Sequence, residues 1–131
     1  MELILDTTFL IDLEREVLNK TKTRPASEFL SINKSANLQI TLITVGEFAE
    51  GFKDTDYLSF RNYLEAFPIL QIDQEVAWIY GQLAKKLRVS KSLIGSNDMW
   101  IAAIALRNNK ALVTRNIKHF KKIPELQLVA Y

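Results

Sequence analysis

The feature that most constrains the fold of this sequence is the alternation of short apolar runs with segments of helical periodicity. Five runs have the length and the apolar or β-branched content of buried strands: ELIL (2–5), LQITLI (38–43), ILQI (69–72), ALVT (111–114) and LQLV (126–129). Strands that alternate with helices pair mainly in parallel, and helices then cover both faces of the sheet. The sequence therefore predicts an α/β fold.

The intervening segments carry apolar residues at the spacing of one helix face. We expect helices over 7–18, from Pro25 onward, over 45–52 and 56–67, from an N-cap at Asp73 to about Leu87, and over 98–107. At 131 residues the chain is long enough for one hydrophobic core and too short for two ordinary domains. We therefore expect one domain spanning residues 1–131.

Composition excludes several classes of site. The chain has no cysteine, which excludes a disulfide framework and a zinc–thiolate site, and its single histidine, His119, excludes a histidine-rich metal site within one chain. The first residues are acidic where a signal peptide would be basic, and no apolar segment approaches the length of a bilayer span. We expect a soluble cytoplasmic domain with no membrane partner.

The net charge of +2 does not by itself indicate a nucleic-acid partner, but the basic residues are clustered. One cluster contains Lys85, Lys86, Arg88 and Lys91, and the other contains Arg115, Lys118, Lys121 and Lys122. Such clusters are either solvated surface or phosphate contacts, and the sequence leaves both interpretations open.

Acidic and amide side chains follow several of the predicted strands. Asp6 comes directly after the first strand, Glu47 lies one turn into the helix after the second, Asp98 heads the helix 98–107, and Asn116 follows ALVT. Because the carboxyl ends of parallel strands share one edge of a sheet, these residues are expected to converge there.

Each acid also has a purely structural explanation. Asp6 would cap the helix that begins at Thr7, and Thr44-x-x-Glu47 has the spacing of a capping box. Asp98 would favour the first turn of its helix, with Ser96 or Asn97 as the cap. These roles are compatible with a functional one, because the helix dipole that favours a capping carboxylate also keeps it ionised.

Converging carboxylates and an amide, with neither sulfur nor histidine, are the ligands that Mg²⁺ and Mn²⁺ prefer. Such ions bind substrate phosphates, activate water and support phosphodiester hydrolysis. Without a cation, carboxylates packed together repel one another and their pKa values rise. We therefore expect Asp98 both to start its helix and to bind a metal ion.

Four blocks of the sequence resemble, in order, the motif blocks of PIN-domain ribonucleases, and the similarity is closest to the VapC-type toxins of toxin–antitoxin pairs. The blocks are LILDTTFLIDL, TLITVGEF, IGSNDMWIAAIAL and ALVTRNIKHFKKIPEL, and together they span residues from Leu3 to about Leu126. The third and fourth blocks are the most specific.

The resemblance implies a parallel sheet of about five strands between helices, Mg²⁺- or Mn²⁺-dependent cleavage of RNA, homodimerisation and inhibition by a cognate antitoxin protein. It assigns Asp6, Glu47 and Asp98 as catalytic and metal-binding residues, with Asn116 at a second metal position where an aspartate is common. Thr114 and Arg115 are expected near the metal or in contact with phosphate.

Three further polar residues lie within or next to these blocks. Asp12 is assigned to the surface, Glu50 is the second choice after Glu47, and His119 is left out of the catalytic set. Two alternative functions remain: a receiver-like signalling module with Asp6 as phosphoacceptor, although no lysine ends the last strand, and a PIN fold kept only for binding a partner.

Overall fold

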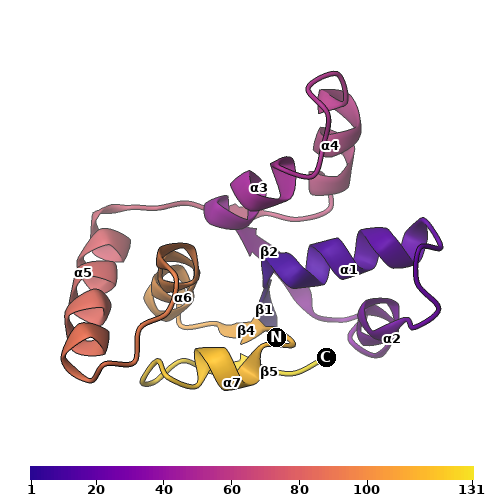
Figure 1. Cartoon of the computed structure of the whole chain (residues 1–131). Helices are drawn as coiled ribbons and strands as arrows, with labels where there is room; N and C mark the ends of the chain where they lie inside the picture. The colour runs from indigo at the N-terminus through magenta and orange to yellow at the C-terminus, as the bar shows by residue number, and fades with distance from the viewer.

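The computed structural model describes all 131 residues and contains one parallel sheet in the strand order β3-β2-β1-β4-β5 (Figure 1). The strands are β1 (Glu2–Leu5), β2 (Asn37–Thr41), β3 (Ile69–Leu70), β4 (Ala111–Val113) and β5 (Leu128–Val129). The central strand β1 pairs Leu3 with Leu38 of β2 on one side and with Ala111 of β4 on the other. The predicted α/β class and parallel sheet are therefore confirmed.

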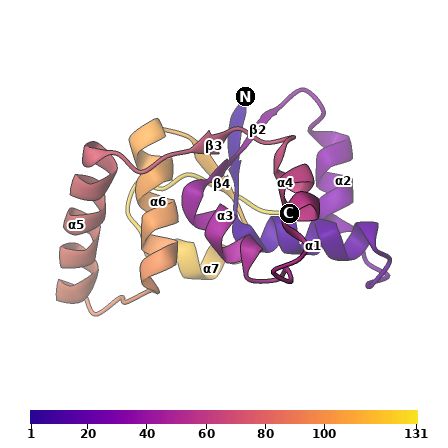
Figure 2. The same cartoon turned by 90° about the horizontal axis from the view of Figure 1, so that it is seen from above.

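Seven helices surround the sheet: α1 (Thr7–Val17), α2 (Pro25–Ile32), α3 (Leu42–Ala49), α4 (Tyr57–Leu64), α5 (Gln74–Val89), α6 (Ser96–Asn108) and α7 (Ile117–Phe120). Side chains along β1 point alternately to the two faces of the sheet and so contribute to two halves of the core. Ile4 packs with residues of α5 and α6, whereas Leu3 and Leu5 pack with residues of α1 and α2. Figure 2 shows these helix pairs on opposite sides of the sheet. None of the helices combines the length and apolar character needed to cross a membrane.

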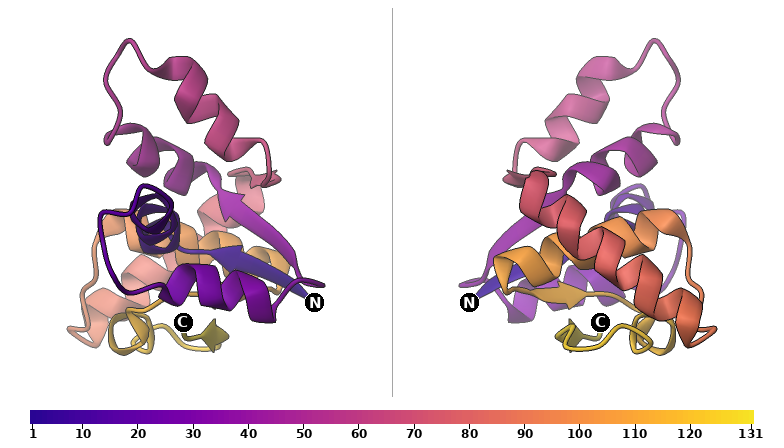
Figure 3. Two further views of the ribbon diagram at one scale, coloured as in Figure 1. Left: turned by 90° about the vertical axis from the view of Figure 1, so that its right-hand side faces the viewer. Right: turned by 90° about the vertical axis from the view of Figure 1, so that its left-hand side faces the viewer.

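Helix α4 lies beside α3 at one end of the molecule (Figure 3), and an aromatic cluster joins the two helices. Phe48 of α3 and Phe52, in the turn after it, meet Phe60 and Tyr63 of α4 at ring-centroid distances between 5.5 and 6.3 Å. Aromatic edge contacts of this kind add to the burial of apolar area. They fix α3, the helix that carries Glu47.

The structure corrects the boundary between the second strand and the helix that follows it, and it adds one helix. Leu42 and Ile43, predicted to extend the second strand, begin α3 instead, because the Thr41 hydroxyl caps that helix by accepting from the Thr44 amide at 3.1 Å. The short α7 was not predicted. Asp73 is confirmed as the N-cap of α5, where it accepts from the Val76 amide at 2.8 Å.

Helix α6 is buried on nearly all sides, and the residues from Ile101 to Ala105 are each no more than 1% exposed. Its outer edge is covered by α5, where Tyr80 stacks on Trp100 with ring centroids 3.8 Å apart. This packing explains why the run after Asp98 shows almost no polar face. It also holds the first turn of α6, which carries Asp98, against the sheet.

A buried acid, Glu16, joins α1 to α2. Its carboxylate accepts from the backbone amides of Ala26 at 3.0 Å and Ser27 at 2.9 Å, at the start of α2, where Arg24 supplies no side-chain cap. Burial acts to raise the pKa of Glu16. Hydrogen bonds from Ser27 and Ala26, with the nearby charge of Arg24, outweigh burial and hold the pKa below its usual 4.5.

We predict that Glu16→Gln lowers the free energy of unfolding at pH 7 by about 1–3 kcal/mol, because one amide of α2 loses its acceptor. Since the folded-state pKa is lowered, the stabilisation by Glu16 is present above pH 4.5 and is lost as the pH falls through the folded value. Urea unfolding of both proteins at several pH values should show the difference shrinking in acid. The control is Glu14→Gln, since the Glu14 carboxylate makes no hydrogen bond; an equal loss in that variant would contradict the assignment.

Candidate active site

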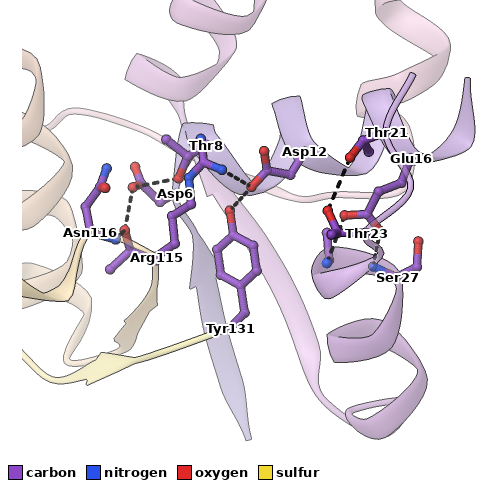
Figure 4. Close-up of polar contacts among 12 residues, drawn as sticks. Asp6, Thr8, Asp12, Glu16, Thr21, Thr23, Ser27, Arg115, Asn116 and Tyr131 are labelled. Atoms are coloured by element: carbon purple, nitrogen blue, oxygen red, sulfur yellow. Dashed lines mark hydrogen bonds and ion pairs between the residues drawn. The ribbon is translucent and has the colours of Figure 1, made fainter. Parts of the chain in front are cut away.

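Asp6 lies at the junction of β1 and α1 and is only 3% exposed. It is the N-cap of α1, and its Oδ1 accepts from the Thr7 amide at 2.8 Å. Its Oδ2 accepts from the hydroxyl of Thr114 at 2.8 Å and from that of Thr8 at 3.2 Å. Figure 4 shows Asp6 with Thr8 and Asn116 close to it. The predicted capping role is confirmed, and it leaves the carboxylate buried among hydroxyl groups.

The electrostatics of Asp6 identify a second acid close by. Burial raises the pKa of Asp6 above its usual 3.8, and the negative charge of Asp98 raises it further. Hydrogen bonds from Thr114, Thr7 and Thr8 oppose this shift without cancelling it. Two carboxylates from distant parts of the chain therefore repel each other at one edge of the sheet.

Glu47 bridges the helices on either side of this edge. Its Oε1 accepts from the Thr7 hydroxyl at 2.6 Å, and its Oε2 lies 3.4 Å from Nδ2 of Asn97, which donates to it. The predicted capping box at Thr44 is wrong, because Thr41 is the cap of α3 and Glu47 points to α1 and α6 instead. Glu50 is exposed and its carboxylate makes no hydrogen bond.

Asp98 lies in the first turn of α6, about one-third exposed. The predicted caps Ser96 and Asn97 are wrong, because Gly95 is the N-cap and no side chain caps the helix. The Oδ2 of Asp98 lies 2.8 Å from Nε2 of His119, which α7 presents one turn after Asn116. Sequence reasoning missed this contact because it did not predict α7.

The end of β4 is tied to Asp6 through Thr114. This fully buried threonine donates to Asp6 and accepts from the backbone amide of Asn116 at 3.0 Å. The Asn116 side chain is exposed and makes no capping hydrogen bond. Thr114 thus lies next to Asp6, whereas the Asn116 amide group is free to face solvent.

Asp12 is not a surface residue as predicted. It is 8% exposed, its Oδ2 accepts from the Tyr131 hydroxyl at 2.6 Å, and the same oxygen lies 3.1 Å from Nη1 of Arg115. Burial, and next the hydrogen bond to Asp12, raise the pKa of Tyr131 above its usual value, so that its hydroxyl stays a donor near neutral pH. The sequence signal was the place of Asp12 on the buried face of α1, with Phe9 and Glu16.

The side chains at this edge offer oxygen ligands only, apart from His119, which already contacts Asp98. Carboxylate and hydroxyl oxygens suit a hard divalent cation, and its positive charge would offset both the burial and the charge of Asp98, which raise the pKa of Asp6. No three acidic or histidine side chains lie close enough together to hold one ion between them. The donor chemistry therefore fits Mg²⁺ or Mn²⁺ with water completing the coordination.

Residues 3–126 match the family model described as PIN domain, and the chain therefore belongs to the PIN-domain family. Within that family it is similar to proteins named VapC. It is 32% identical to Ribonuclease VapC of Rickettsia bellii (strain RML369-C) over 130 residues, covering 98% of this chain and 96% of that protein. It is 30% identical to Ribonuclease VapC1 of Haemophilus influenzae (strain R2866), covering 95% and 93%.

The fold agrees with that of a solved complex. The crystal structure of VapBC2 from Rickettsia felis, bound to a DNA fragment from their promoter, contains a chain that matches with a TM-score of 0.85 and 27% identity. The match covers 100% of this chain and 99% of that one. The receiver-like alternative is therefore wrong.

We predict that Asp98→Asn lowers the pKa of Asp6 toward 3.8, because it removes the negative charge of Asp98, which together with burial raises that pKa. Because the pKa of Asp6 is raised in the folded state, ionisation of Asp6 destabilises the fold, and the free energy of unfolding of the wild type falls as the pH rises through that pKa. The free energy of unfolding of Asp98→Asn should fall by less over the same pH range. Carboxyl chemical shifts followed by NMR against pH measure the first effect. Asp54→Asn, in the exposed turn after α3, is the control, and an Asp6 pKa unchanged by Asp98→Asn would contradict the proximity.

Proposed function

We propose that this protein is a metal-dependent endoribonuclease that acts in the cytoplasm as the toxin of a toxin–antitoxin pair. Its relatives are named as VapC ribonucleases, and the observation that carries the proposal here is the convergence of acids at the carboxyl edge of the sheet. Thr7 donates its amide to Asp6 and its hydroxyl to Glu47, and Glu47 also accepts from Asn97, the residue before Asp98. A structural cap needs no second charge beside it. Two acids kept together against their repulsion favour a cation and, through it, a phosphodiester substrate.

The residues proposed to hold Mg²⁺ or Mn²⁺ are Asp6 and Asp98, with Glu47 close by and Asn116 at a second, weaker position. When bound, the ion would supply a water of lowered pKa and positive charge for the developing oxyanion. The chain itself orients the ligands: Thr114 and the Thr7 amide fix Asp6, and the Thr7 hydroxyl fixes Glu47. His119 holds one oxygen of Asp98 and leaves the other free for a ligand.

The proposed inhibitor is a cognate antitoxin protein. VapBC2 of Rickettsia felis was solved as a complex, and an unrestrained ribonuclease would degrade the RNA of its own cell without such a partner. We expect the antitoxin to place an Arg or Lys against Asp6, Glu47 or Asp98, where its charge replaces that of the ion. Homodimerisation remains a prediction, which light scattering of the purified protein tests.

We predict that co-expression with the neighbouring small gene yields a stable complex without ribonuclease activity. The complex should regain activity when the antitoxin is removed by limited proteolysis. Equal specific activity with and without the neighbour, at the same amount of this chain, would contradict the antitoxin proposal while leaving the nuclease proposal intact.

We predict that Asp98→Asn retains the fold and lowers RNA cleavage by about two orders of magnitude or more, because the charge that would hold the ion is lost while side-chain volume is kept. Glu47→Gln should reduce cleavage as well. The matched control is Glu50→Gln, one turn further along and exposed, which should cleave at the wild-type rate.

Cleavage of a fluorescent RNA with Mg²⁺ or Mn²⁺ present measures all three variants, and circular dichroism checks their folding. Activity of Asp98→Asn within a few-fold of wild type would refute the assigned site.

A further inference from the structure

A small polar pocket lies along α1 and contains none of the proposed metal ligands Asp6, Glu47 and Asp98. It measures about 100 Å³, and none of its lining residues is hydrophobic; they include Asp12, Arg15, Glu16, Thr21, Thr23 and Arg115. Asp12 follows Asp6 by six residues of α1, a rise of about 9 Å. Figure 4 shows this row of polar side chains extending from Asp6 and Asn116 past Asp12 toward Thr21 and Thr23.

The acids of this pocket are already paired. Glu16 accepts from the amides of Ala26 and Ser27, and Asp12 accepts from Tyr131 and is paired with Arg115. The hydroxyl groups of Thr21 and Thr23 lie 3.2 Å apart and bond to each other. A ligand in this pocket therefore meets few free acceptors.

The cationic donors, in contrast, are largely uncommitted. Arg15 is exposed and forms no ion pair. Arg115 uses only Nη1 toward Asp12, and its side chain is 54% exposed. A guanidinium group carries five N–H donors and matches the oxygens of a phosphate group. The free chemistry of the pocket is that of an anion site.

Arg115 is also held in a fixed direction. It leaves the end of β4 beside Thr114 and points to Asp12, as Figure 4 shows. Asp12 is fixed in turn by the hydroxyl of Tyr131, whose ring packs against Phe9 at a centroid distance of 4.7 Å. A guanidinium group fixed in this way loses less conformational entropy when it binds a ligand than a free surface arginine does.

We propose that this pocket is a binding subsite for the RNA backbone, in which Arg115 and Arg15 contact a phosphodiester group flanking the one that is cleaved. Asp12 and Tyr131 are positioning residues that act through Arg115. The inference rests on the proposed ribonuclease function and adds the direction of the bound RNA. The RNA runs from Asp6 along α1 toward the loop between α1 and α2.

The test is the affinity for a short fluorescent RNA, measured by anisotropy in the Asp98→Asn background, with chelator, over a range of salt concentrations. Arg115→Ala and Arg15→Ala should each weaken binding about three- to tenfold and reduce the slope of log K against log salt by about 0.7, the loss of one phosphate contact on a single strand. The control is Lys34→Ala, which removes the same charge from an exposed turn before β2, at the amino ends of the strands. It should change neither the affinity nor the salt slope.

In the otherwise wild-type enzyme, Arg115→Ala should raise KM and leave kcat within about twofold, because the contact is made equally in the ground and transition states. Tyr131→Phe should weaken RNA binding less than Arg115→Ala does and should have no further effect in the Arg115→Ala background. A merely structural role for Tyr131 would lower the melting temperature and leave the salt slope unchanged.

The outcomes separate this inference from the proposed function. If the wild-type protein cleaves RNA while both arginine variants keep its affinity and salt slope, the subsite is refuted and the nuclease stands. Loss of antitoxin capture by these variants, with RNA binding unchanged, would likewise overturn the subsite and make it a protein-docking site. A wild-type protein that neither binds nor cleaves RNA would refute both.

Discussion

Asp6 is an ionisable side chain placed where water hardly reaches it, between the central strand and the first helix, with a second carboxylate near enough to raise its pKa. The unfavourable burial of this carboxylate is offset because its oxygens cap α1 and accept hydrogen bonds from the hydroxyl groups of Thr8 and Thr114. Each of these bonds joins an element that must be in place for the site to exist. Stability and site geometry therefore depend on the same carboxylate.

The parallel sheet is what brings the second acid to that position. Since β1 lies between β2 and β4, the segments that follow all three strands leave the sheet at one edge, and α3 and α1 both start there. The first turn of helix α6 lies at the same edge of the sheet. Because the rest of α6 is almost completely buried, the position of Asp98 is fixed. Hydroxyl and amide groups of Thr7, Asn97 and Thr114 then orient the acids.

Much of this was predictable from the sequence, because strand and helix periodicities were strong and Asp6, Asp98 and Thr114 sit at element boundaries. The start of α3 was not, since Leu42 and Ile43 continue a β-branched run and only the hydroxyl of Thr41 ends it. The contacts of His119 and Asp12 were not predictable, because α7 was not predicted and the partners are remote in sequence: Asp98 lies 21 residues from His119, and Tyr131 lies 119 residues from Asp12. No local pattern reports such pairings.

The role proposed for Asp6 and Asp98 is to bind a divalent cation between them. Crystals soaked in Mn²⁺ and measured at a wavelength where manganese scatters anomalously test it most directly. We expect one strong anomalous peak within coordination distance, about 2.0–2.3 Å, of oxygens of both carboxylates, and its loss in Asp98→Asn crystals. No peak at this edge of the sheet at millimolar Mn²⁺, or a peak that persists in Asp98→Asn, would contradict the claim.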